Sequence, residues 1–288
     1  MMCNKSIKPL MKRKKQPQKY PIGIFDSGFG GISVLNEVVK LLPGEAIIYF
    51  GDSANCPYGE KSAKEVIRLS EQITEFLIAH DCKLIITACN TATGLTIRHL
   101  RRKYDIPFIG IEPAIKPAAQ ASETGHIGIL ATRNTFRSDH FINTKNQFAK
   151  HVVVHKRPGI GLVEAVEKNQ IMTESTKILL QKYLAPMICN NIDALVLGCT
   201  HFPFLEEPIR QILPDSVEIY NPAPAIAVHT KNILTENNIL SPGPTANYQF
   251  FTTGDAYLMQ QFIENNFVKY EPDKTTVSKI SIEIAPQP

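Results

Sequence analysis

Residues 84–93 have the sequence LIITACNTAT, an apolar run that stops at the thiol of Cys89 and continues with small hydroxyl and amide side chains. A short apolar run bounded in this way predicts a buried strand of a parallel sheet that delivers Cys89 to its carboxyl end. Residues 194–201, with the sequence ALVLGCTH, repeat the arrangement about 110 residues later around Cys199. We therefore expect two strands that each present one thiol.

The residues around each cysteine favour an anion site. A small residue, Ala88 or Gly198, precedes the thiol and lets a ligand approach the backbone closely. The polar residues that follow are typical of a helix start, where unpaired N–H groups bind anions and lower the pKa of a nearby thiol. We expect Cys89 and Cys199 to face each other across one small anionic substrate.

Expected strands and helices alternate on either side of the first stretch. Residues 22–26 (IGIFD) predict a strand, and the glycine-rich turn 27–31 (SGFGG) leads into an apolar-periodic helix at 32–42. This alternation predicts a parallel sheet with right-handed crossovers, whose ligand lies beyond the carboxyl ends of the strands. The same part of the chain predicts strands at 46–50 and 107–111, a long loop at 51–61 and a helix at 62–80.

The opening pattern recurs in the second half of the chain. Residues 128–132 (GILAT) resemble 23–27 (GIFDS) and precede Cys199 by a similar distance to that between Asp26 and Cys89. We predict an α/β fold of two pseudo-symmetric parallel-sheet α/β domains with the active site in the cleft between them. The expected domains are residues 21–112 plus 222–288, and residues 113–221. Further elements are expected as helices at 135–149, 162–168 and 173–189, strands at 152–154, 217–220 and 248–251, and a terminal helix.

The composition is that of an ordinary soluble protein, with 43% hydrophobic and 20% charged residues. No run reaches the ~18 apolar residues that span a bilayer, and the amino-terminal segment lacks the apolar region of a signal peptide. Residues 1–20 hold seven Lys or Arg and no acid, whereas the rest has 24 basic and 27 acidic residues. We expect residues 1–20 to form a disordered, solvated extension; the alternative is contact with nucleic acid or another polyanion.

The six cysteines form no CxxC pair, which favours reduced thiols in a cytoplasm. No metal site is expected, because the spacing of Cys199 and His201 differs from zinc patterns and no second cluster completes it. Cys56 is interpreted as a loop neighbour. Three cysteines are expected to be inert core residues: Cys3, Cys82 and Cys189.

Two opposed thiols match one kind of chemistry. Inverting the α-carbon of an amino acid without a cofactor requires a base on one face and an acid on the other, which a thiolate and a thiol can supply. Asp26 is placed to assist Cys89. The matching position of the second half is Ala131, so we expect His201 to assist Cys199, with Glu164 orienting His201.

Four motifs, at 23–31, 56–59 (CPYG), 88–93 and 197–203, together resemble the glutamate racemases of bacterial cell-wall synthesis, within the wider aspartate/glutamate racemase family. The resemblance implies a cofactor-independent, two-base interconversion of L- and D-glutamate, with the D-isomer used for peptidoglycan, and a homodimer. It places Cys89 and Cys199 on the catalytic cysteines. It also implies assisting roles for Asp26, Glu164 and His201. The positions that it implies for substrate binding are Asp26, Ser27, Tyr58, Gly59, Asn90, Thr91, Thr132, Thr135, Thr200 and His201.

Alternative functions stay open at this point. The chain could be a racemase of a related amino acid such as aspartate, or a binding module that senses an amino acid without chemistry. Dinucleotide binding is another alternative, because residues 28–33 (GFGGIS) follow a strand and Asp52 closes the next one, although Ser33 stands at the third glycine position. The resemblance implies one more alternative, contact of the basic extension with a cell-wall precursor that acts as an activator, since some members of the family use a similar extension in this way.

Overall fold

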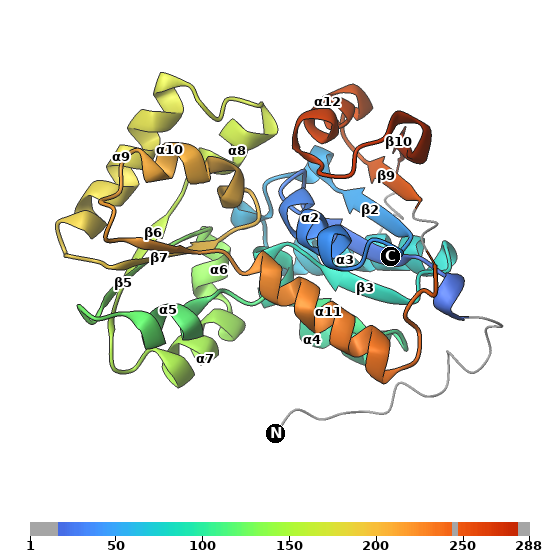
Figure 1. The fold of residues 1–288 in the computed structure, drawn as a ribbon, viewed down its shortest axis with the longest axis horizontal. Coiled ribbons are helices and arrows are strands. Elements are labelled where there is room, and N and C mark those ends of the chain that lie inside the picture. The colour runs from blue at the N-terminus through green and yellow to red at the C-terminus, as the bar shows by residue number, and fades with distance from the viewer. Residues whose placement is uncertain (1–16, 244–246, 282–288) are drawn as a thin grey trace.

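The computed structural model describes residues 17–243 and 247–281. Two β-sheets lie beside each other, every strand pair in them is parallel, and helices cover the faces of both sheets (Figure 1). The predicted fold class, two parallel-sheet α/β units, is confirmed.

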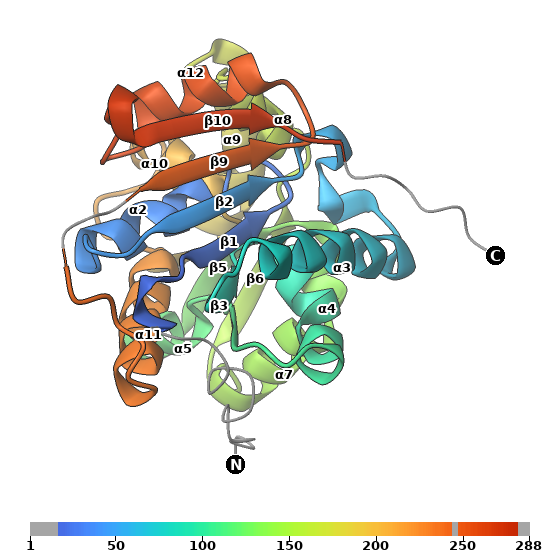
Figure 2. The same ribbon diagram turned by 90° about the vertical axis from the view of Figure 1, so that its right-hand side faces the viewer.

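Six strands form the first sheet, in the order β10 (Thr275–Lys279), β9 (Tyr248–Thr252), β2 (Ile47–Gly51), β1 (Ile22–Asp26), β3 (Leu84–Thr87) and β4 (Phe108–Gly110). One face is covered by α2 (Ile32–Leu41), α11 (Ala223–Glu236) and α12 (Ala256–Asn266). The opposite face is covered by α3 (Ala63–Ala79) and α4 (Asn90–Lys103). Figure 2 shows the sheet between these two layers of helices.

Four strands form the second sheet, in the order β6 (Val153–Pro158), β5 (His126–Ala131), β7 (Ala194–Gly198) and β8 (Glu218–Tyr220). On one face pack α8 (Leu162–Glu167), α9 (Glu174–Ile188) and α10 (Glu206–Arg210). On the other face pack α5 (Ile115–Ala121) and α7 (Asp139–Phe148), and α6 (Arg133–Arg137) precedes α7. Short 3₁₀ turns complete the chain: η1 (Pro17–Lys19), η2 (Ser53–Asn55), η3 (Tyr58–Glu60), η4 (Phe202–Leu205) and η5 (Pro272–Lys274).

The two sheets repeat one four-stranded unit. The order β2-β1-β3-β4 of the first sheet recurs as β6-β5-β7-β8 in the second. Asp26 therefore ends β1 where Ala131 ends β5, and Cys89 follows β3 as Cys199 follows β7. Because the carboxyl ends of parallel strands lie at one edge of a sheet, each unit presents its cysteine at that edge.

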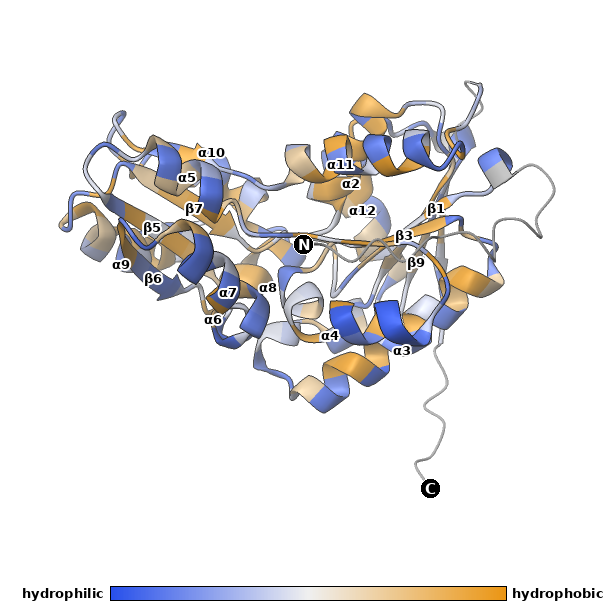
Figure 3. Ribbon diagram, turned by 90° about the horizontal axis from the view of Figure 1, so that it is seen from below, coloured by the Kyte–Doolittle hydropathy of each residue, from blue (hydrophilic) through white to orange (hydrophobic). Residues whose placement is uncertain are grey.

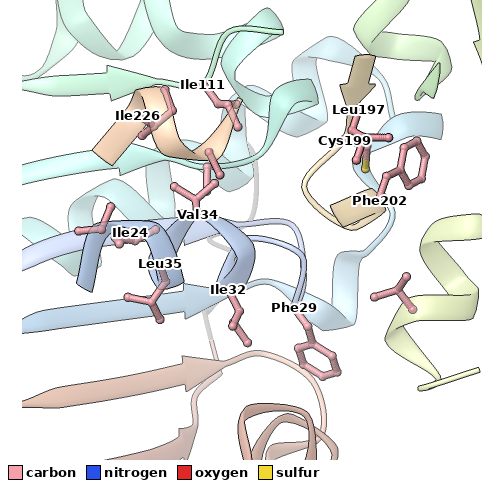
Figure 4. Packing of buried hydrophobic residues seen from close by; sticks show 14 of the residues in the cluster. Ile24, Phe29, Ile32, Val34, Leu35, Ile111, Leu197, Cys199, Phe202 and Ile226 are labelled. Carbon is pink, nitrogen blue, oxygen red and sulfur yellow. The ribbon is translucent and has the colours of Figure 1, made fainter. Parts of the chain in front are cut away.

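The apolar pattern of the strands decides which helices they bury. Along β3, Leu84 and Ile86 pack with α2, whereas Ile85 packs with α3, as the period of two requires. Figure 3 shows most strands as mainly hydrophobic, the edge strand β6 as largely hydrophilic, and the helices as banded. One apolar cluster crosses from the first sheet to the second: Phe29 and Ile32 lie in it with Leu197 and Phe202 (Figure 4).

The structure differs from the expected elements at three places. A strand, β10, follows α12 where no further strand was expected; it is a mainly polar edge strand that buries little of its surface. The helix expected at 135–149 is divided into α6 and α7, because the Ser138 side chain accepts a hydrogen bond from the Phe141 N–H and starts a new helix. Helix α5 was not expected.

The first sheet takes its strands from both ends of the chain and the second from the middle. The exact domain limits, 21–112 with 222–288 and 113–221, stay predictions. The predicted basic extension, residues 1–20, lies outside the described residues except for its last four. Among the described residues, no helix combines the length and the apolar character that crossing a bilayer requires.

Candidate active site

The structure brings both predicted thiols to one small cavity between the two sheets. Cys89 caps the start of α4, directly after β3, and Cys199 lies in the turn between β7 and η4. The cavity has a volume of about 10 Å³, which is room for one water molecule. Its walls come from both domains: Ser27, Pro57, Tyr58, Gly59, Cys89, Asn90, Thr91, Thr132, Val163, Cys199, Thr200 and His201.

Cys89 is buried in a setting that favours its neutral form. Its side chain is 5% exposed, its Sγ accepts a hydrogen bond from the Ala92 N–H at 3.4 Å, and it lies 3.7 Å from the Ser27 Oγ. Burial, reinforced by the nearby carboxylate of Asp26, raises the pKa of Cys89 to about 12, although the Ala92 N–H acts in the opposite direction. Cys89 therefore carries a proton at neutral pH.

Cys199 has a different helper. Its Sγ lies 3.8 Å from the Nδ1 of His201, and the Nε2 of His201 lies 2.6 Å from the Oε1 of Glu167. Burial lowers the pKa of His201, but hydrogen bonds to Cys199, Cys56 and Glu167 outweigh burial and raise that pKa well above its ordinary value. His201 thus presents a protonated ring nitrogen to Cys199 at neutral pH. The two thiols are pseudo-symmetric in position and asymmetric in environment.

The structure corrects the prediction for Glu164. Its side chain is exposed to solvent, and Glu167 lies against His201 instead. Both residues are on α8, whose apolar side faces the core through Leu162 and Val166. Glu167 lies almost one turn closer to the carboxyl end of that helix, about 4.5 Å further along its axis, and this end reaches the cleft.

Glu167 also joins the two domains. Its Oε1 accepts a hydrogen bond of 2.6 Å from the backbone N–H of Phe29, in the glycine-rich turn after β1. Glycine is required in this turn by close approach: a Cβ on Gly28 would lie 2.3 Å from the Glu167 Oε1, and one on Gly30 would lie 2.3 Å from the His201 Nδ1. The turn is thus shaped to receive the His201–Glu167 pair of the other domain.

Asp26 is fully buried, close to Cys89 and to His201. Its two oxygens accept hydrogen bonds from the Gly28 N–H at 3.1 Å and from the Thr200 hydroxyl at 3.0 Å. Burial raises the pKa of Asp26, while His201 and these two hydrogen bonds oppose the rise. The effect of Asp26 on Cys89 is electrostatic, through the pKa of the thiol. Its bond to Thr200 is a second link between the domains.

Three of the predicted substrate contacts form a hydroxyl cluster at the cavity, which Thr91 and Thr132 line. The hydroxyls of Thr91, Thr132 and Thr135 form a cluster with oxygen separations of 2.8, 2.9 and 3.4 Å, although they come from α4 and from the start of α6. Both polar atoms of the Asn90 amide are buried and have no hydrogen-bond partner among the described residues. Buried polar groups are nearly always bonded, so the Asn90 amide is a candidate to bind a polar ligand.

The loop that carries Tyr58 and Gly59 is held by Asp52. The Asp52 carboxylate accepts hydrogen bonds from the Tyr58 hydroxyl at 2.5 Å, from the Asn55 amide at 2.9 Å and from the Thr253 hydroxyl at 2.6 Å. Tyr58 therefore forms a wall of the cavity with its hydroxyl turned to Asp52. A fully buried Asp52 bound by three protein donors is not placed to hold a ribose, which contradicts the dinucleotide alternative.

Replacement of Asp52 by asparagine is expected to lower kcat/KM at least about tenfold, mainly by raising KM. Hydrogen bonds to a charged group contribute ~1.5–3 kcal/mol, and ~1.4 kcal/mol corresponds to tenfold. Asp193→Asn is the matched control, because Asp193 holds another loop, through Ser122 and the Glu123 and Thr124 N–H groups, at the amino end of β7. Equal kinetic losses in the two variants would contradict a specific role for Asp52.

Three participants of the site were not predicted as such. Glu167 and Asp52 are ordinary acidic residues in the sequence, and Cys56 was interpreted as a loop neighbour. Cys56 is half-buried and hydrogen-bonded to His201. Of the cysteines expected in the core, Cys82 is buried but Cys189 is exposed at the end of α9, which corrects that prediction; Cys3 lies outside the described residues.

Comparison with known proteins gives concordant matches. The family model for Asp/Glu/hydantoin racemases matches residues 22–230. A glutamate racemase of Ectopseudomonas mendocina is 41% identical over 83% of this chain and 92% of its own length. A glutamate racemase isoform of Bacillus anthracis superposes with a TM-score of 0.83 at 32% identity, over 92% of this chain and 98% of its own. Escherichia coli glutamate racemase, solved with L-glutamate and the activator UDP-MurNAc-Ala, superposes with a TM-score of 0.79 at 30% identity, over 91% and 98%.

Proposed function

Because this chain belongs to the Asp/Glu/hydantoin racemase family, we propose that it interconverts L- and D-glutamate without a cofactor, with Cys89 and Cys199 as the two acid-base groups. The observation that carries the proposal is the placement of both thiols on the wall of one buried cavity, after matching strands of two repeated units. An amino-acid sensor would need the cavity and its polar wall, but it would have no use for paired thiols.

The environments of the thiols support a division of labour. A thiolate at Cys199, beside the protonated His201, takes the α-hydrogen of the substrate as a proton, and the neutral Cys89 gives its own proton to the opposite face of the same carbon. One proton is taken and one is given, so the substrate leaves inverted and the thiols have exchanged roles. The reverse reaction then starts from a thiolate at Cys89.

The polar wall of the cavity supports glutamate as the substrate. A carboxylate is bound well by N–H and O–H donors near a helix start, which the first turn of α4 and the Asn90 amide supply. The hydroxyls of Thr91, Thr132 and Thr135 add donors from both domains. Ser27 and Thr200 lie on the cavity wall beside the thiols. We assign these groups to the two carboxylates and the ammonium of glutamate.

Admission of glutamate then requires the domains to separate, since the closed cavity holds about one water molecule. The polar contacts between the domains include Glu167 to the Phe29 N–H, Asp26 to the Thr200 hydroxyl, and the exposed Arg133–Glu60 ion pair, and the apolar cluster of Figure 4 also crosses between the domains. An ion pair exposed to solvent contributes at most ~1 kcal/mol, so this part of the contact opposes opening weakly.

Incubation with L-glutamate in D₂O under reducing conditions tests the proposed function. Each turnover exchanges the α-hydrogen with solvent, so mass spectrometry should show incorporation of one deuterium together with formation of D-glutamate. A parallel incubation with aspartate should give a lower kcat/KM, because one methylene changes transition-state binding by ~1–3 kcal/mol. Binding of glutamate without exchange would favour the sensing module, and a preference for aspartate would favour the aspartate alternative.

The proposal includes the biological setting that the family resemblance implies, namely D-glutamate supply for peptidoglycan by a cytoplasmic homodimer. Catalysis by two free thiols requires a reducing compartment such as the cytoplasm. The free thiols in this structure include Cys56, Cys89, Cys189 and Cys199.

A further inference from the structure

Three side chains with different metal-ligating atoms meet at the edge of the cavity. The Sγ of Cys56, a carboxylate oxygen of Glu167 and a ring nitrogen of His201 all lie within 4.8 Å of one another. They come from three separate segments: the loop between η2 and η3, the end of α8, and the turn after β7. Cys56 belongs to the first domain, whereas Glu167 and His201 belong to the second, so the cluster forms where the domains meet.

We propose that Cys56, Glu167 and His201 form an inhibitory binding site for a thiophilic divalent cation, Zn²⁺. The inhibitory part rests on the proposed racemase function, and the binding part does not. Thiolate sulfur, imidazole nitrogen and carboxylate oxygen are the protein ligands of Zn²⁺, and three of them with one open position form a typical zinc site. Of the three groups, His201 also lines the cavity that holds the two catalytic thiols. Tetrahedral Zn²⁺ with bonds of about 2.0–2.3 Å places its ligand atoms roughly 3.3–3.6 Å apart, so the Nε2 of His201 and the Oε1 of Glu167, which now lie 2.6 Å apart, must move slightly apart to receive the ion.

The surroundings supply the outer contacts that a zinc site needs. Glu167 already accepts the Phe29 N–H, which leaves its carboxylate held in place. The second ring nitrogen of His201 faces the Cys199 sulfur at 3.8 Å, so a zinc-bound His201 can donate its remaining N–H to that sulfur. Such hydrogen bonds orient ligands and raise metal affinity. The Asp52 network described above steadies the loop that carries Cys56.

Binding of Zn²⁺ would inhibit racemisation although the ion itself takes no part in the proton transfers. The ion takes the Nε2 position that His201 now shares with Glu167, at 2.6 Å, so the imidazolium loses one proton to solvent. Cys56 loses its thiol proton on ligation, because the thiolate is the ligand. His201 is then fixed as a neutral ring with its only N–H on Cys199.

Calorimetric titration of the reduced full-length protein with zinc chloride tests the binding. We expect one Zn²⁺ per chain in the wild type and at least about tenfold weaker binding in Cys56→Ser. Loss of a hydrogen bond to a metal ligand costs about 10–100-fold in affinity, and loss of a ligand itself should cost no less. Cys189→Ser is the matched control, because Cys189 is an exposed free thiol far from the site in sequence and structure. Wild-type affinity in Cys56→Ser would overturn the proposal, as would the absence of stoichiometric binding by the wild type.

Cobalt substitution identifies which sulfur is the ligand. Co²⁺ bound to the wild type should show a sulfur-to-cobalt charge-transfer band that Cys56→Ser loses and Cys89→Ser keeps. The reverse result would place the ion between the catalytic thiols and would overturn the proposal. The calorimetric titration and the cobalt band do not depend on turnover. Failure of zinc binding is therefore distinguishable from failure of the proposed racemase function in the D₂O experiment. In racemase assays, each protein is compared with its own rate without zinc. Free zinc should inhibit the wild type and Cys189→Ser at concentrations that do not lower the rate of Cys56→Ser. A chelator should restore the inhibited activity.

Discussion

Replacement of either Cys89 or Cys199 by serine is expected to lower racemisation of glutamate by about 100-fold or more. General acid-base catalysis by a positioned group contributes ~10²–10⁴-fold, and a serine hydroxyl is too weak an acid and its alkoxide too rarely formed to replace a thiol at neutral pH. Both thiols are almost fully buried and serine is nearly isosteric, so the fold should persist. Polarimetry or a coupled assay of the opposite enantiomer measures the loss in both directions.

Two further measurements separate a lost acid-base group from a damaged site. Each variant keeps one thiol on one side of the substrate, so slow exchange of the α-hydrogen with D₂O should survive for one enantiomer and be lost for the other, with opposite preference in the two variants. Cys189→Ser should turn over normally, because that exposed thiol lies at the end of α9. Normal racemisation by Cys89→Ser or by Cys199→Ser would rule out the two-thiol mechanism.

Glu167→Gln is expected to reduce kcat by about 10- to 100-fold. The carboxylate accepts a 2.6 Å hydrogen bond from His201, and hydrogen bonds to charged groups contribute ~1.5–3 kcal/mol. Glutamine keeps an oxygen that can accept the Phe29 N–H, so the domain contact is retained and the charge is removed. Glu164→Gln is the matched control on the same helix, and it should retain wild-type kcat because Glu164 is exposed to solvent.

The pH dependence of activity should also change in Glu167→Gln, in a direction that follows from the pKa of His201. Glu167 is one of the groups that raise the pKa of His201 above its ordinary value. If the charged imidazolium is the active form, activity is present below the His201 pKa and is lost as the pH rises through it. Removal of the carboxylate lowers that pKa, so the alkaline loss of activity should move to lower pH in Glu167→Gln and stay in place in Glu164→Gln. Unchanged profiles in both variants would show that Glu167 does not act through His201.

The fold was predictable where the sequence pattern is local. The strands that carry the site are short apolar runs bounded by turn residues, and such runs are recognisable without knowledge of their partners. Strand β10 escaped prediction because an edge strand is half-solvated and its residues, TTVSK, are mainly polar. The break between α6 and α7 escaped because it depends on whether Ser138 caps a new helix or continues the old one, and both are compatible with the sequence.

The site was predictable for residues that immediately follow strands, such as Cys89 and Cys199. It was not predictable for groups that reach the cavity from elsewhere. The choice between Glu164 and Glu167 depends on which side of α8 faces the core and on where the helix ends. The choice is decided by packing, since both acids lie outside the apolar stripe of the helix.

The amino-acid sequence by itself determined the repeated strand-and-thiol unit, because strand periodicity and the residues after each strand are properties of a few neighbouring positions. Only the tertiary structure decided which distant groups act on those thiols. His201 meets Glu167 across 34 residues, and Thr253 meets Asp52 across 201. Cys56 comes within reach of the same histidine only because two domains close on each other. Such contacts depend on how whole helices and sheets pack, and no local pattern of residues specifies that geometry.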